Sequence, residues 1–135
     1  MRVITVLLMT CILVALGCSK KDKEIKTNND LLIGKWNGVS YGWELNNDGI
    51  YQYGEADNPY LREVYIKFDA DGNGEDKNES GSISSITWSL NDNTKLTINA
   101  GSVSYLAEIV SINNSQLTLK TTFGSNVRYV IYSRQ

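Results

Sequence analysis

Two short motifs carry residue types that can do chemistry, and the first centres on a serine. Gly38 to Gly42 matches the Gly-x-Ser-x-Gly pattern, in which a nucleophilic serine sits on a sharp turn between a strand and a helix. Such a serine needs a base, usually a histidine, to accept its proton. The chain has no histidine, and this motif falls inside a predicted strand. We therefore predict no catalytic serine and no enzyme, and we expect the glycines to relieve crowding where the strand bends.

The second motif is acidic. Asp69 to Gly74 matches the first half of an EF-hand calcium loop, with oxygen ligands at the first, third and fifth positions and glycine at the sixth. The twelfth position of such a loop is a glutamate that binds calcium through both oxygens. Here that position is Ser80, and Glu79 comes one place early. Turns between strands select the same residue types. The pattern favours an ordinary acidic turn, leaves bound calcium open, and predicts no metal ligands and no cofactor elsewhere.

The N-terminus carries a third reactive group, the thiol of Cys18. Met1 and Arg2 precede an apolar run, Val3 to Leu16, which is shorter than the roughly 20 residues that span a membrane. Ala15 to Cys18 resembles the lipobox of bacterial lipoproteins. The resemblance implies a signal peptide over residues 1–17, a diacylglyceryl group on Cys18, and sorting to the outer membrane because serine follows the cysteine. The alternative is an ordinary signal peptide with a chance cysteine.

Composition limits what the mature chain can do. The 13 basic and 15 acidic residues leave a net charge of −2, and nucleic-acid binding is disfavoured because it needs a basic surface. Cys11 lies in the signal, so no free thiol remains for a disulfide or a thiolate metal site once Cys18 is acylated. Residues 18–30 are polar and lysine-rich, and we interpret them as a flexible tether that spans about 20 Å.

Residues 31–135 form one predicted domain. Short runs rich in β-branched and aromatic residues alternate there with clusters of Asn, Asp, Gly and Ser, which is typical of strands and tight turns, and no helical period is evident. The eight predicted strands are Lys35 to Leu45, Gly49 to Gly54, Tyr60 to Phe68, Ile83 to Leu90, Lys95 to Asn99, Ser102 to Ile112, Gln116 to Phe123 and Val127 to Ser133.

The connectors between these strands are short, so neighbouring strands must pair antiparallel. Only the segment from Asp69 to Ser82 and the one from Glu55 to Pro59 are longer. The prediction is an all-β fold, an antiparallel up-and-down meander closed into a small eight-stranded barrel, because closure removes exposed strand edges.

Alternation along the strands predicts which side chains face the core. The predicted core residues are Val64, Ile66, Phe68, Ile86, Trp88, Leu90, Leu96, Ile98, Leu117, Leu119 and Phe123. Val39, Tyr41, Trp43 and Leu45 share one face of the first strand. The segment from Val127 to Ser133 is apolar on both faces, which leaves its register open, and Tyr65 is expected to be a surface aromatic.

Five segments together resemble the bacterial lipocalin-like domain: Leu32 to Trp36, Ile66 to Gly72, Thr87 to Leu90, Leu96 to Ile98 and Leu117 to Leu119. The resemblance covers nearly all of the predicted domain and implies a lipocalin-like barrel. It also implies that Gly34 and Trp36 belong to the barrel closure, with Arg134 or Arg128 packed over the tryptophan.

Two non-enzymatic functions follow from the resemblance. The first is a membrane-anchored lipoprotein that binds a small apolar ligand inside the barrel, lined by Phe68, Trp88, Tyr105 and Phe123. The second is a structural or protein-interaction lipoprotein of the cell envelope whose barrel is filled by its own side chains, since eight-stranded barrels are often just wide enough for that. The expected partners are the membrane, through the N-terminal lipid, and the ligand; we expect a monomer and no nucleic acid.

Overall fold

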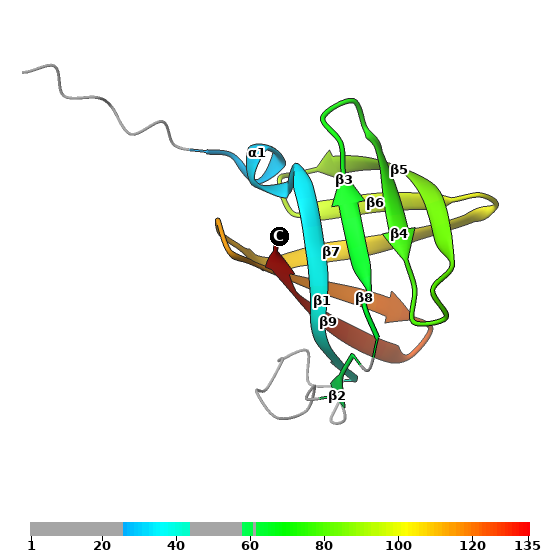
Figure 1. Ribbon diagram of the computed structural model, residues 1–135. Helices are drawn as coiled ribbons and strands as arrows, with labels where there is room; N and C mark the ends of the chain where they lie inside the picture. Colours follow the sequence, from blue (N-terminus) through cyan, green and yellow to red (C-terminus); the bar gives the residue numbers. More distant parts are fainter. Residues whose placement is uncertain (1–25, 44–57, 61) are drawn as a thin grey trace, which may run out of the picture.

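The computed structural model describes residues 26–43, 58–60 and 62–135, and these form a closed antiparallel barrel (Figure 1). The strands are β1 (Gly34–Trp43), β2 (Asn58–Pro59), β3 (Tyr65–Phe68), β4 (Asn73–Lys77), β5 (Ile83–Asn91), β6 (Lys95–Ala100), β7 (Val103–Ile112), β8 (Gln116–Phe123) and β9 (Asn126–Arg134). Each pairs antiparallel with its neighbours in the sheet, and β1 pairs with both β3 and β9. The two-residue β2 pairs only with β1. The other eight strands close the barrel, which confirms the predicted eight-stranded meander.

One strand of the barrel was not predicted. Strand β4 lies where the sequence predicted a loop, and the predicted strand Gly49 to Gly54 lies outside the described residues. The inward positions of β4 are Gly74 and Asp76, which pair with the core residues Phe68 and Ile66 of β3. A Cβ atom at Gly74 would lie 2.1 Å from the backbone oxygen of Lys67. Glycine is therefore needed for the close approach of two backbones, and β4 has no apolar alternation to reveal it.

A β-bulge in β1 changes which residues face inward. The register shifts between Gly38 and Ser40, so Val39 is an extra residue opposite β9 and is 48% exposed. Trp36 before the bulge and Tyr41 after it consequently face the same side of the strand. The prediction that Val39 shares a face with Tyr41 is therefore wrong, because strict alternation does not hold across a bulge. Leu45, the last residue of that predicted face, lies outside the described residues.

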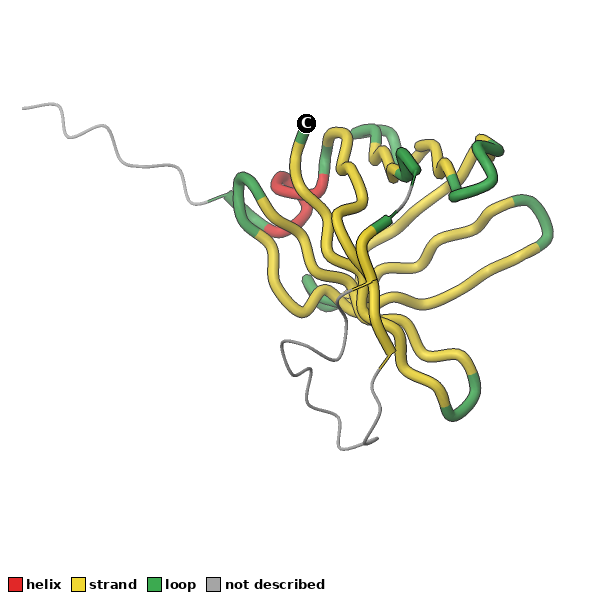
Figure 2. Tube along the Cα trace, turned by 60° about the horizontal axis from the view of Figure 1, so that its bottom comes forward, coloured by secondary structure: helices red, strands yellow, loops and turns green. Residues whose placement is uncertain are grey.

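A short helix that the sequence analysis missed, α1 (Asn28–Leu32), precedes β1. A capping box starts it: the Thr27 amide donates to Asp30 Oδ2 at 3.0 Å, and the Asp30 amide donates to Thr27 Oγ1 at 3.3 Å. Leu32 at its end is fully buried in the core. Figures 1 and 2 place α1 at the same end of the barrel as the C-terminus. No helix in the described ranges is long and apolar enough to cross a membrane.

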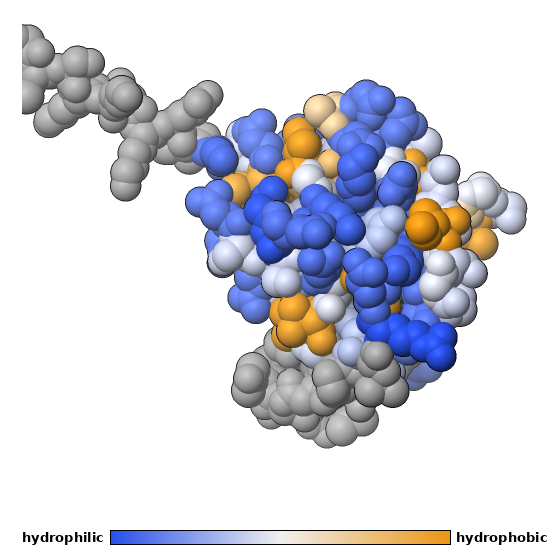
Figure 3. Space-filling view, viewed as in Figure 1, coloured by the Kyte–Doolittle hydropathy of each residue, from blue (hydrophilic) through white to orange (hydrophobic). Residues whose placement is uncertain are grey.

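The predicted core is buried, with exceptions at its edges. Leu90 is only half-buried, and Phe123 is 47% exposed because it lies at the end of β8. Tyr65 was expected at the surface but is only 8% exposed. The ammonium of Lys35 covers its ring at 4.1 Å from the centroid, and its hydroxyl donates to Glu75 at 3.1 Å. The face drawn in Figure 3 is mostly hydrophilic, with hydrophobic residues in small separate groups.

Candidate ligand-binding site

The end of the barrel next to α1 is sealed by Trp36 and Arg134. Trp36 is fully buried, and its indole nitrogen donates to the Leu32 carbonyl at 2.7 Å. The guanidinium carbon of Arg134 lies 4.2 Å from the centroid of the Trp36 ring. Arg134 also donates to the Ile33 carbonyl at 2.9 Å and to the Leu31 carbonyl. Of the two arginines considered from the sequence, Arg134 is thus the one that packs over Trp36.

Gly34 makes this closure possible. Its φ of +130° is a conformation that side chains rarely adopt, and a Cβ atom there would lie 2.8 Å from Nη1 of Arg134. The fold therefore brings Gly34, Trp36 and Arg134 together at one end, which we call the closed end.

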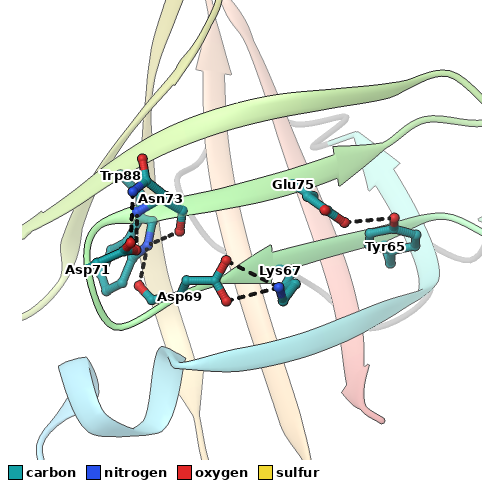
Figure 4. Close-up of polar contacts among 7 residues, drawn as sticks. All are labelled: Tyr65, Lys67, Asp69, Asp71, Asn73, Glu75 and Trp88. Carbon is teal, nitrogen blue, oxygen red and sulfur yellow. Dashed lines mark hydrogen bonds and ion pairs between the residues drawn. The ribbon is translucent and has the colours of Figure 1, made fainter.

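Phe68 and Trp88 fill the half of the barrel next to the closed end. Their rings meet edge to face at 5.3 Å between centroids, an arrangement that aromatic pairs favour. The Trp88 indole donates to the carbonyls of Asp69 and Asn73, at 3.1 and 2.9 Å (Figure 4). Both residues belong to the buried core, and neither is among the residues that line the cavity in the other half of the barrel. The predicted lining is revised accordingly.

In the acidic turn between β3 and β4, the carboxylates accept hydrogen bonds from nearby residues (Figure 4). Asp71 accepts hydrogen bonds from the amide and the side chain of Asn73, at 3.0 and 2.9 Å, and these bonds lower its pKa. Asp69 accepts from Lys67 Nζ at 3.2 Å. Within the described ranges, no three side chains of His, Cys, Asp or Glu are grouped to hold a metal ion. This geometry is that of a tight turn.

The serine motif lies wholly within β1, whereas a nucleophile elbow places its serine on a sharp turn between a strand and a helix. Its first glycine has a packing role instead. A Cβ atom at Gly38 would lie 2.8 Å from the ring of Tyr60 and 3.3 Å from Val64 Cβ. Gly38 therefore makes room for the Tyr60 ring to cross the strand.

The other half of the barrel holds a cavity of about 470 Å³. Its wall is apolar where it meets the core, and it includes the two remaining predicted lining residues, Tyr105 and Phe123. The apolar lining residues are Val64, Ile66, Ile98, Val103, Leu119, Phe123 and Val130. The polar ones are Tyr60, Asp76, Lys77, Asn78, Glu79, Tyr105, Thr121, Arg128 and Tyr132. The cavity thus combines an apolar wall with several polar groups.

Arg128, on β9, is the principal cation of the cavity. Its Nη2 donates to the Tyr60 hydroxyl at 3.0 Å, and its guanidinium carbon lies 4.8 Å from the centroid of the Tyr41 ring. Its Nε is buried and has no hydrogen-bond partner. Among the described residues, no carboxylate lies within ion-pair distance of Arg128. The charge is therefore held by aromatic faces and one hydroxyl rather than by an acid.

Asp76, on β4, is the acidic group of the lumen. It is half-buried, and within the described ranges no side chain or amide hydrogen-bonds to it. Burial raises its pKa, although the charge of Arg128 opposes this shift. Burial also raises the pKa of Tyr105 to about 12 and raises that of Tyr132. The tyrosine hydroxyls are therefore neutral hydrogen-bonding groups across the physiological range.

The sequence analysis missed most of the polar groups of the cavity. Arg128 was considered only as a partner for Trp36, and Asp76 fell inside the predicted connecting segment from Asp69 to Ser82. The pairing of β9 with β1 places Arg128, Val130 and Tyr132 inward. The sequence indicated this inward face only through spacing, because Arg128, Val130, Tyr132 and Arg134 follow one another at intervals of two residues. The strand is apolar on both faces, so the spacing alone did not identify the inward one.

Comparison with known proteins identifies one family. The model of a lipocalin-like domain matches residues 32–119. That range includes Gly34 and Trp36 of the closed end and ends within β8, before the strand that carries Arg128 and Arg134. No curated protein and no solved structure matches the chain significantly.

Proposed function

The chain belongs to the lipocalin-like domain family, and from that premise we propose that it binds a small, largely apolar ligand in the open half of its barrel. The observation that carries the proposal is the cavity of about 470 Å³, since small-molecule sites commonly enclose about 300 to 1,000 Å³ between apolar walls and a few polar groups. The alternative of a barrel filled by its own side chains describes only the closed half.

The two halves differ because of the sizes of their inward side chains. Near the closed end the inward positions hold the large aromatic residues Trp36, Phe68 and Trp88, which are buried in one core cluster. In the cavity half, short inward side chains such as Val64, Thr121 and Val130 stand among the larger tyrosines. Shorter side chains on a barrel of constant strand number leave space along its axis.

We also propose that Cys18 carries a lipid anchor after removal of residues 1–17, and that the protein is a non-catalytic lipoprotein of the bacterial outer membrane. The resemblance of Ala15 to Cys18 to a lipobox supports the anchor, and several acyl chains hold a protein on a membrane far better than one. The chain joins the barrel through α1 at the closed end, whereas β2 lies at the other end (Figure 1). The mouth of the cavity is thus at the end remote from the attachment point.

A binding titration tests the cavity. Every contact of the barrel given above lies within residues 26–135, so a chain spanning 19–135 retains the whole barrel. The neutral probe decanol should quench or shift tryptophan emission saturably, with one molecule per chain. Trp43 is the expected reporter because its ring lies 5.9 Å from the guanidinium of Arg128.

Two neighbouring threonines of β8 supply a matched pair of variants. Thr121 is buried and lines the cavity, whereas Thr122 is exposed on the outer face. We expect Thr121→Phe to fill the cavity and abolish decanol binding, and Thr122→Phe to leave it unchanged. The proposal fails if decanol does not bind to the folded domain, or if both variants bind it equally well.

A further inference from the structure

We propose that the ligand is an amphipathic monocarboxylic acid whose carboxylate binds Arg128 and Tyr60 and whose apolar tail lies along the cavity wall. This inference rests on the proposed function and adds the chemical class of the ligand. It is carried by the arrangement of donors around Arg128.

Arg128 is half-buried, its Nε is fully buried, and few acceptors among the described residues meet its guanidinium. An arginine remains charged on burial and offers five N–H donors, yet one hydroxyl is its single hydrogen-bond acceptor among the described residues. The other inward arginine of β9, Arg134, also has an unpaired Nε, but both of its Nη atoms donate to carbonyls. Within the part of the chain that the structure describes, Arg128 is therefore the inward arginine of β9 with unpaired donors, and a carboxylate matches the fork geometry of those donors.

Tyr60 adds a second donor beside Arg128. Its hydroxyl oxygen accepts a hydrogen bond from Arg128 at 3.0 Å, so its own hydrogen is available for another acceptor. The ring reaches this position because Gly38 has no side chain. A carboxylate at this point would receive hydrogen bonds from a guanidinium and from a phenol, both charge-assisted and stronger than neutral ones.

Asp76 raises the competing possibility of a cationic head group. It faces the lumen from β4, and Arg128 faces it from β9, beyond ion-pair distance. Burial raises the pKa of Asp76, which means that its surroundings disfavour the charged carboxylate, whereas the guanidinium of Arg128 is stabilised by two aromatic faces and the Tyr60 hydroxyl. Lys77 is engaged by Glu63 at 2.8 Å, and Glu79 is exposed at the mouth. The lumen therefore favours an anion over a cation.

The apolar tail has a defined place. Ile98, Leu119 and Val130 line the cavity between the polar mouth and the core. Beyond them the barrel is filled by Phe68 and Trp88, which limits the depth to which a chain can enter. A medium-length chain with its carboxylate at the mouth fits this arrangement.

Three probes of equal chain length test the inference: decanoic acid, decanol and decylamine, each titrated at neutral pH into the chain spanning 19–135. We expect the acid to bind at least about tenfold more tightly than the alcohol or the amine. Arg128→Gln should reduce the affinity for the acid to that for the alcohol, while the alcohol binds as before. Tyr60→Phe should weaken the binding of decanoic acid a few-fold. Arg62→Gln is the charge-matched control, since Arg62 is exposed and does not line the cavity, and it should change nothing.

The outcomes separate the two proposals. If decanol binds but the acid has no advantage over it, if the amine binds most tightly, or if Arg128→Gln leaves acid binding unchanged, the carboxylate inference is overturned and cavity binding stands. If none of the three probes binds, cavity binding itself fails. The comparison of probes on the parent chain needs no variant, and decanol binding by Arg128→Gln shows that this variant is folded.

Discussion

Arg134 packs on Trp36 with its guanidinium carbon 4.2 Å from the centroid of the indole ring, and this pair seals one end of the barrel. The other inward arginine of the same strand, Arg128, stands over the Tyr41 ring at the open end. One strand thus carries one arginine that closes the fold and one that faces the cavity.

Trp36→Ala tests the closed end. Trp36 is fully buried, so its truncation should lower the free energy of unfolding by about 3 to 5 kcal/mol, as large aromatic truncations in cores do. The matched control is Trp43→Ala, which removes a tryptophan that is 40% exposed and should cost about 1 kcal/mol or less. Urea denaturation measures both. Equal losses from the two variants would contradict the closure role of Trp36.

Gly34→Ala tests how the closure is built. Gly34 and Gly81 both have positive φ, but only at Gly34 would a Cβ atom meet a neighbour, the guanidinium of Arg134. Backbone strain alone should cost each alanine variant about 1 to 3 kcal/mol. The Gly34 variant should lose more, because Arg134 must also move away from its carbonyl partners. Similar midpoints of thermal unfolding for Gly34→Ala and Gly81→Ala would show that Arg134 accommodates the methyl group without loss.

The alternation of apolar residues was sufficient to predict the meander and most of the core. It was not sufficient to predict how far along the barrel axis each inward side chain lies. Phe68 and Trp88 face inward as predicted, but strand stagger places them in the filled half, whereas Tyr105 reaches the cavity. Period-two patterns distinguish the two faces of a strand and contain no information about stagger.

The parts of the site that the sequence did not predict were missed for similarly local reasons. Strand β4 was missed because its inward positions are a glycine and an aspartate, and Val39 was placed on the wrong face of β1 because a bulge interrupts the alternation there. The polar groups of the cavity come together from four separate elements, since Tyr60 follows β2, Asp76 is on β4, Tyr105 is on β7 and Arg128 is on β9. No linear motif connects them.

Asp76→Asn tests the charge balance of the lumen. The pKa of Asp76 is raised above its ordinary value of 3.8 in the folded protein. Its contribution to stability is therefore fully present below the unfolded pKa and is lost as pH rises through the folded pKa. The pKa values of Tyr60, Tyr105 and Tyr132, which share the lumen, are raised above 10, so these hydroxyls do not titrate in this window.

The variant should consequently be more stable than the parent at neutral pH, and this advantage should shrink as pH falls toward about 4. Decanoic acid should also bind the variant more tightly at neutral pH, because a negative charge has been removed from the lumen. Urea denaturation and the acid titration at several pH values measure the two effects. A variant less stable than the parent at neutral pH would indicate that the Asp76 carboxylate is stabilised in the fold.

Cys18→Ala tests the anchor. We expect the parent protein, expressed with its signal in a bacterial host, to partition into the detergent phase of a Triton X-114 separation. The variant should appear in the aqueous phase or remain as an uncleaved precursor, because no thiol is available for the diacylglyceryl group. Radiolabelled palmitate should be incorporated only by the parent. A variant that still carries label would place the lipid elsewhere.

The position of a bound acid tests the central claim most directly. A crystal structure of residues 19–135 with ω-bromodecanoic acid would locate the tail by the anomalous signal of bromine and the head by its electron density. We predict one bromine per chain inside the barrel, beside Ile98 and Leu119, with the carboxylate at Arg128 and Tyr60. Bromine found only on the outer face of the barrel, with an empty lumen, would contradict the account.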